Sequence, residues 1–88
     1  MKELTMFIQK TCPHCVLAQK YIAQLCRDDS RYSALPIHEI DEYVQSELAD
    51  SYDYWYVPSF FIGKKKLHEG HAEYADIKNV LDAALLAD

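Results

Sequence analysis

The chain has 88 residues, half of them hydrophobic, and its 14 acidic and nine basic side chains give a net charge of −5. A chain of this length forms one domain, here residues 1–88, and its apolar half is sufficient for a buried core, which excludes a disordered protein. The acidic balance also argues against nucleic acid as a partner, because phosphate binding needs clustered lysine and arginine.

The first part of the chain is typical of a strand followed by a helix. Leu4–Ile8 is a short apolar run of β-prone residues, and polar residues then interrupt it. A helix is expected to begin at Pro13, because proline suits the first helical position, and to end in the cluster Asp28-Asp29-Ser30. Its apolar positions recur at three- and four-residue spacing: Val16, Leu17, Tyr21, Ile22, Leu25 and Cys26.

A second strand and a short second helix are expected next. Residues 34–42 place Leu35 and Ile37 on one face, and Pro36 suits an edge or the start of a strand. A short amphipathic helix is then predicted from the four-residue spacing of Val44, Leu48 and Tyr52.

The last third of the chain predicts two strands and a helix. Residues 57–63 form an apolar strand, and a lysine-rich turn joins it to a strand in 64–70. The final helix is marked by Tyr74, Ile77, Val80, Leu81, Ala84 and Leu85. The order βαβαββα predicts an α/β fold with a four-stranded mixed sheet and three helices, in which the first two strands are parallel and the last two form a hairpin.

The cysteines bear on the compartment. The opening segment "MKELTMFIQK" is too short and too interrupted in its apolar part for a signal peptide, and no run approaches the roughly 20 apolar residues of a membrane helix. Three cysteines, an odd number, do not suit the disulfide framework of a small secreted protein. We therefore expect a cytoplasmic protein with no membrane partner. We also expect a monomer, because nothing in the exposed pattern demands a dimer.

The segment "KTCPHC" at residues 10–15 places two thiols two residues apart. Three roles are open for such a pair: a structural disulfide, half of a metal site, or a redox centre that cycles. If the helix begins at Pro13, Cys12 occupies its N-cap, where unpaired backbone N–H groups and the positive end of the helix dipole stabilise a thiolate. A reducing compartment favours redox or metal chemistry for this pair.

The helix start predicts different roles for the residues of the motif. Cys15 lies in the first turn, within reach of Cys12 but more enclosed. Cys12 is expected to attack a substrate disulfide and Cys15 to resolve the mixed disulfide. Pro13 fixes the direction in which the helix leaves the loop. His14 has no obvious partner and is expected to point to solvent near the sulfurs, where its protonated form favours the thiolate; the alternative is an ordinary exposed histidine.

Cys12-Pro13-His14-Cys15 after a first strand, with Val57-Pro58 opening a later one, resembles the glutaredoxin and thioredoxin superfamily. The resemblance covers nearly the whole chain in element order, and Lys10 is similar to a lysine of the glutaredoxin-like branch. It implies a thioredoxin-like fold and a thiol–disulfide oxidoreductase that reduces protein or small-molecule disulfides through a Cys12–Cys15 disulfide. It also implies a cis peptide bond before Pro58; the alternative is a trans proline at a strand start.

The resemblance further implies a surface for substrate or glutathione, formed by Lys10, Thr11, Val57, Pro58, Gly70 and His71. Relatives that use glutathione have a double glycine and an acidic pair after the fourth strand, whereas this chain has Gly70 followed by His71 and Ala72. A single glycine is more similar to the small redoxins that thioredoxin reductase reduces. No bound cofactor is expected, and the electron donor is either glutathione or thioredoxin reductase.

Three assignments stay open in the sequence. The alternative function is a metal-binding or iron–sulfur cluster module that uses Cys12 and Cys15, although no full ligand set is visible and no metal site is assigned. Cys26 shares the apolar face of its helix, so a buried structural thiol is favoured over a regulatory one. Trp55 and Tyr56 either face a peptide substrate or pack under the second helix.

Overall fold

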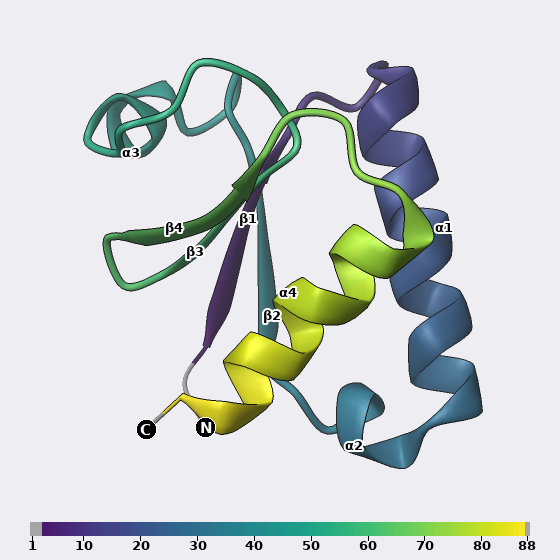
Figure 1. Cartoon of the computed structure of the whole chain (residues 1–88). Helices are drawn as coiled ribbons and strands as arrows, with labels where there is room; N and C mark the ends of the chain where they lie inside the picture. The colour runs from purple at the N-terminus through teal and green to yellow at the C-terminus, as the bar shows by residue number, and fades with distance from the viewer. Residues whose placement is uncertain (1–2, 88) are drawn as a thin grey trace.

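The structure is a computed structural model that describes residues 3–87, and this part of the chain forms one mixed sheet with helices on both faces (Figure 1). The elements in chain order are β1 (Leu4–Ile8), α1 (Pro13–Asp28), α2 (Ser30–Ser33), β2 (Ile37–Asp41), α3 (Ser46–Asp50), β3 (Ser59–Ile62), β4 (Lys65–Glu69) and α4 (Tyr74–Leu86). None of these helices combines the length and the apolar composition needed to cross a membrane.

The sheet has the strand order β2-β1-β3-β4. β1 pairs with β2 in parallel, and it pairs with β3 in the antiparallel sense, as β3 does with β4. The predicted mixed sheet, with its parallel first pair and its final hairpin, is therefore confirmed. The arrangement is compatible with the thioredoxin-like fold that the sequence resemblance implies.

Two helices differ from the prediction. The short helix α2 was not predicted and makes a fourth helix where three were expected. It follows α1 directly, because the Asp29 side chain accepts a hydrogen bond from the Arg31 backbone N–H at 2.9 Å and so starts a new helical turn. The helix predicted on Val44, Leu48 and Tyr52 is wrong in its extent, because α3 spans only Ser46–Asp50. Val44 is 74% exposed and Leu48 is 38% exposed, so their spacing does not mark a buried face.

The central strand β1 is buried along its whole length. Leu4, Met6 and Ile8 belong to the larger hydrophobic cluster, whereas Phe7 belongs to a second cluster on the other face of the sheet. A strand that is covered on both faces has a continuous apolar run in place of alternation, as "LTMFI" does.

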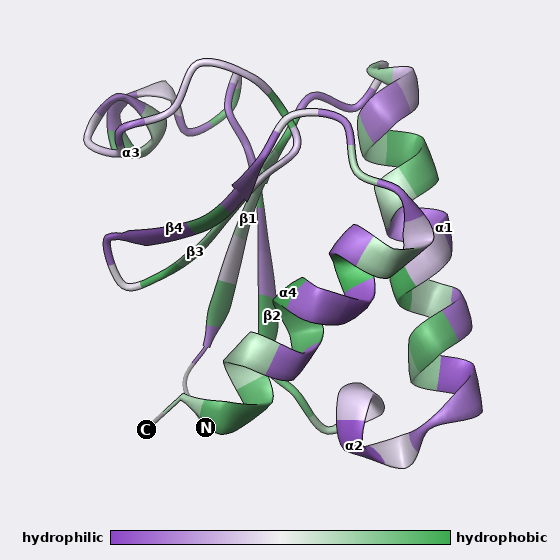
Figure 2. Cartoon of the chain, in the orientation of Figure 1, coloured by the Kyte–Doolittle hydropathy of each residue, from purple (hydrophilic) through white to green (hydrophobic). Residues whose placement is uncertain are grey.

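The larger cluster fills the space between the sheet and the helices α1 and α4. Its helical members include Cys15, Ala18, Leu25, Ile77, Val80, Leu81 and Ala84. Figure 2 shows that the neighbouring strands β3 and β4 differ, since β3 is hydrophobic and β4 is largely hydrophilic. Tyr74, one of the positions that predicted this helix, is 36% exposed at the start of α4 and packs edge-on against Tyr21, with 5.7 Å between ring centroids.

The second cluster is aromatic and covers the face of the sheet on which α3 lies. The Phe7 ring stacks on Tyr54 at a centroid distance of 4.9 Å and meets the edges of Tyr52 and Phe61. Lys64 closes the cluster, because its ammonium lies 3.8 Å from the centroid of the Tyr52 ring and donates to the Ser51 carbonyl. Tyr52 therefore packs in this cluster although it lies beyond the end of α3.

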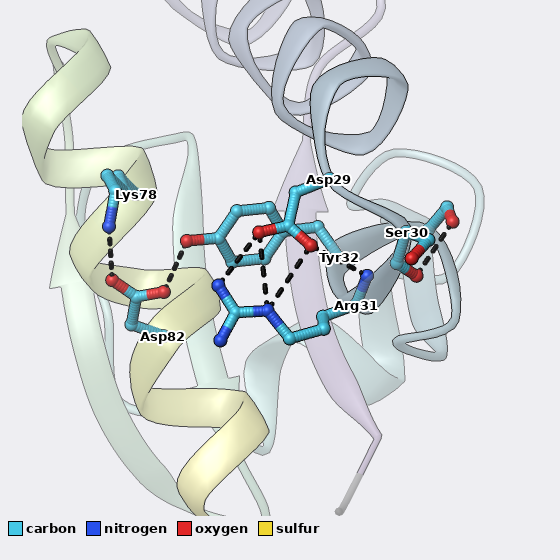
Figure 3. A network of polar contacts seen from close by, with 7 residues as sticks. Asp29, Ser30, Arg31, Tyr32, Lys78 and Asp82 are labelled. Carbon is cyan, nitrogen blue, oxygen red and sulfur yellow. Dashed lines mark hydrogen bonds and ion pairs between the residues drawn. The ribbon is translucent and has the colours of Figure 1, made fainter.

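A polar network joins α2 to α4 at the end of α1 (Figure 3). The buried Tyr32 donates its hydroxyl to the Asp82 carboxylate, and Lys78 pairs with the same carboxylate at 2.8 Å. The hydrogen bond to Asp82 raises the pKa of Tyr32, whereas Lys78 and Tyr32 together hold the pKa of Asp82 below its ordinary value. Arg31 pairs with Asp29 at 2.8 Å beside this network. These contacts fix the C-terminal end of α1 against α4.

Candidate functional site

The cysteine motif lies at the N-terminal end of α1. Cys12 is the N-cap residue, with extended backbone dihedral angles, and its side chain makes no capping hydrogen bond. Its N–H donates to the Gln9 carbonyl at 3.1 Å, and its carbonyl accepts from the Val16 N–H at 3.1 Å. Pro13 follows at the start of the helix, where no partner is needed for the missing N–H. The predicted N-cap position of Cys12 is confirmed.

The two cysteines lie close together in different environments. Cys12 and Cys15 come within 3.8 Å of each other and are both free thiols. Cys12 is half-buried, whereas Cys15 is only 1% exposed. Burial raises the pKa of the Cys15 thiol to about 12, although a backbone hydrogen bond at Gln9 acts in the opposite direction. At neutral pH Cys15 therefore keeps its proton.

The peptide bond between Val57 and Pro58 is cis, as the resemblance implies. Pro58 is buried, and its carbonyl accepts a hydrogen bond from the Gly70 N–H at 2.7 Å. Gly70 has a φ of +84°, a left-handed conformation that glycine adopts without strain. Val57 and Cys12 pack against the same core cluster. Within residues 3–87, the backbone groups of Val57 make no hydrogen bond, so they are available to an extended substrate.

His14 and His71 meet beside the motif. Their Nδ1 atoms are 2.9 Å apart and their rings cross at 83°, while the other ring nitrogen of His71 contacts the Glu73 carboxylate. The expectation that His14 has no partner is therefore wrong, although its side chain is exposed. Because one Nδ1 must donate and the other accept, the hydrogen bond needs different protonation at the two nitrogens. The expectation that His71 lies near the cysteine motif is confirmed.

A hydrogen-bond network around Glu42 was not predicted from the sequence. Glu42 accepts from the Tyr54 hydroxyl at 2.6 Å, and the Gln9 amide donates to its other carboxylate oxygen. Burial, followed by the bond to Glu42, raises the pKa of Tyr54, and the charge of Glu42 adds to the rise of the Cys15 pKa. No local pattern reveals these contacts, because Gln9 and Glu42 are 33 residues apart.

An open groove of about 570 Å³ lies next to the hydrogen-bond network around Glu42. Tyr52 and Tyr54 line it, as do the carboxylates of Glu42, Asp50 and Asp53. Two further rings, Tyr43 and Trp55, also line it and are 73% and 85% exposed. We call this feature the acidic groove.

The residues before Val57 are held through their backbone. The Trp55 and Tyr56 N–H groups donate to the Glu69 carboxylate at 2.5 and 2.9 Å, and Lys66 pairs with the same carboxylate. Lys66 and these N–H groups hold the pKa of Glu69 below its ordinary value. With Tyr56 70% exposed as well, the alternative in which both rings pack under the second helix is wrong.

The remaining predicted residues have simpler surroundings. Lys10 and Thr11 are exposed in the loop before Cys12. Cys26 is half-buried against the larger cluster, so the expectation of a buried thiol is met only in part, and burial raises its pKa. Among residues 3–87, no three or more histidine, cysteine, aspartate or glutamate side chains are grouped so that they could hold a metal ion.

Comparisons with known proteins bear on the fold. No protein-family model and no curated protein matches the chain. Among solved structures, the chain is similar to one described as the structure of a malarial protein, with a TM-score of 0.69 and 15% sequence identity. The similarity covers 96% of this chain and 97% of that one. A likeness at this identity shows a shared fold and leaves activity to be argued from the site.

Proposed function

We propose that the protein is a glutaredoxin-like thiol–disulfide oxidoreductase. The observation that supports this function best is the asymmetry of the two neighbouring thiols. Cys12 is partly accessible at a helix N-terminus, and Cys15 lies 3.8 Å away, buried, with its pKa raised to about 12. A reaction that uses one sulfur for attack and the other for resolution needs this difference.

The proposed reaction transfers two electrons to the substrate. The Cys12 thiolate attacks one sulfur of a substrate disulfide, forms a mixed disulfide and releases the other substrate sulfur as a thiolate, which takes up a proton. Cys15 then loses its proton and attacks the Cys12 sulfur. This second step releases the remaining substrate thiol and leaves a Cys12–Cys15 disulfide. A donor of two electrons must then reduce this disulfide before another turnover.

The other predicted site residues act on binding in this proposal. The unpaired backbone groups of Val57 pair with an extended substrate segment, and Pro58 supports that loop from beneath. Lys10 and Thr11 border the same surface on the motif side. His14 supplies a donor, or a positive charge when protonated, beside the attacking sulfur.

The segment before α4 favours thioredoxin reductase over glutathione as electron donor. This helix has a reciprocal capping box, in which the Glu73 side chain accepts from the third helical N–H and the Asp76 carboxylate accepts from the Glu73 N–H at 2.9 Å. Two carboxylates therefore occupy the helix N-terminus that follows Gly70 and His71. The departure that supports the preference for thioredoxin reductase is the single Gly70, which is followed by His71 and Ala72 where relatives that use glutathione have a double glycine. We place the activity in the cytoplasm.

The test is NADPH consumption with a small disulfide substrate, once with thioredoxin reductase and once with glutathione plus glutathione reductase. We expect turnover with thioredoxin reductase, loss of at least about a thousandfold in Cys12→Ser, and trapped mixed disulfides with protein substrates in Cys15→Ser. Cys26→Ser is the matched control, because it removes a half-buried thiol outside the pair and should keep full activity. Full activity in Cys12→Ser would refute the proposal.

A further inference from the structure

We infer that the acidic groove docks a basic segment of a protein substrate, with an arginine or lysine side chain held between its rings and its carboxylates. The inference rests on the proposed function for its use in catalysis. The docking itself is a property of the surface, and it can be measured without any redox reaction.

The charge of the acidic groove selects a cation. Glu42, Asp50 and Asp53 line it, and no lysine or arginine does. Asp50 and Asp53 are exposed and make no side-chain hydrogen bond or ion pair to other residues within 3–87. An incoming guanidinium or ammonium group would gain these carboxylates as partners, whereas an acidic segment would be repelled.

The rings of the acidic groove add a second attraction for the same chemistry. Trp55 and Tyr43 are exposed to an extent that is unusual for large aromatic side chains. Aromatic faces attract cations, tryptophan most strongly. One such contact is already present within the protein, because the Lys64 ammonium lies 3.8 Å from the centroid of the Tyr52 ring, which lines the groove.

The acidic groove lies where the flank of a bound substrate would fall. On one side, Gln9 accepts from the Cys12 N–H and donates to Glu42, so one residue links the attacking cysteine to the groove wall. On the other side, Trp55 is two residues from Val57, whose backbone is proposed to pair with substrate. A chain whose disulfide reaches Cys12 therefore has neighbouring residues within reach of the groove.

The walls of the acidic groove are held before any ligand arrives. Both Glu42 oxygens have donors, from Tyr54 and Gln9, and the Glu69 carboxylate fixes the backbone of Trp55. Little ordering is then needed on binding, which favours affinity. The same Glu42 charge adds to the raised pKa of Cys15, so a bound cation would offset it and ease the loss of the Cys15 proton in the resolving step.

Trp55 is the only tryptophan in the chain, so its fluorescence reports directly on the acidic groove. The probe is a short thiol-free peptide with arginines on both sides of a serine, compared with a peptide that has glutamines in their place. We expect a saturable fluorescence change with the arginine peptide, at an affinity about tenfold higher than that of the glutamine peptide. Higher salt should reduce this preference.

Matched variants locate the effect. Asp50→Asn/Asp53→Asn should remove most of the preference for arginine, whereas Glu3→Gln/Asp28→Asn removes the same two charges at the opposite end of the molecule and should keep it. Equal affinity for the two peptides, or equal loss in both double variants, would overturn the inference. A response to free guanidinium ions as strong as that to the arginine peptide would also overturn it, in favour of a site for small cations.

A kinetic arm separates this inference from the proposed function. The same two peptides with a disulfide at the central position are offered to the native protein. Faster reduction of the arginine peptide, by about tenfold in kcat/KM, supports both proposals. Equal reduction rates would overturn the inference and leave the oxidoreductase in place. No reduction of either peptide would overturn the oxidoreductase, while the fluorescence result would still decide the docking.

Discussion

The two ends of α1 are built in opposite ways. At its C-terminal end, the buried Tyr32 and the pair of Asp82 with Lys78 join the following turn to α4. At its N-terminal end, the half-buried Cys12 is the N-cap residue, its side chain makes no capping hydrogen bond, and its thiol is free. A helix that is anchored at one end can leave the other end open for chemistry, because its position no longer depends on the reactive residues.

Alkaline pH is expected to have the largest effect on stability, and this effect comes from the cysteine end of α1. The folded protein holds the Cys15 proton up to a pKa of about 12, above the ordinary value of 9.0. Cys15 therefore stabilises the fold fully below about pH 9 and loses its contribution as pH rises toward about 12, by about 1.4 kcal/mol per pH unit. Denaturant unfolding of the reduced protein between about pH 8 and about pH 10 measures this slope.

The matched variant is Cys15→Ala. The lost sulfur contacts should lower its free energy of unfolding at every pH, but the slope just above pH 9 should become smaller, and the part that remains comes from Cys26, whose pKa is also raised by burial. Tyr32 and Tyr54, whose pKa values are also raised, add to the slope only above about pH 10, the ordinary value for tyrosine. A variant with the native slope between about pH 9 and about pH 10 would contradict the assignment to Cys15.

The anchored end is tested by Asp82→Ala. This change leaves the buried Tyr32 hydroxyl without its acceptor, so we expect a loss of about 2 kcal/mol in the free energy of unfolding and no change in reductase activity. Asp28→Ala is the control, because Asp28 is exposed and its ion pair with Arg27 is long, at 4.0 Å. This change should lower the free energy of unfolding by less than about 0.5 kcal/mol. Adding Tyr32→Phe to Asp82→Ala should cause little further loss, because the unsatisfied hydroxyl is then gone. Similar losses in the two aspartate variants would argue against a special role for this network.

The sequence predicted the open end of α1 better than the anchored end, for a physical reason. Strand β1, the helix start at Pro13 and the N-cap position of Cys12 follow from patterns within a few residues, and all three are confirmed. The cis bond before Pro58 was implied by family resemblance and is present. The tie between Tyr32 and Asp82 spans 50 residues and left no local pattern to detect.

The errors near the site have the same origin. Val44 and Leu48 have the spacing of an amphipathic helix, yet both side chains are exposed and α3 begins only at Ser46, so periodicity alone predicted a buried helical face that the structure does not form. His14 was predicted to lack a partner because His71 is 57 residues away. In both cases, segments distant in the sequence decide which side chains meet or become covered, so a local pattern does not reveal the outcome.

The smallest expected effect comes from His71→Ala, which separates positioning from chemistry at the open end. Without His71, the His14 ring loses its 2.9 Å contact and rotates freely beside Cys12. A unit charge at roughly 5 Å in water contributes about 0.8 kcal/mol, so misplacing it should slow the attack on a disulfide by about fourfold or less. Stopped-flow reduction of a small disulfide measures this rate, and His38→Ala, on β2, is the control that should leave it unchanged.

If His71→Ala matched the native rate at low salt, the histidine pair would have no part in the reaction. A fourfold loss that disappears at high salt would instead identify His71 as the residue that keeps the charge of His14 near the sulfur, because screening removes such an effect and leaves steric ones in place.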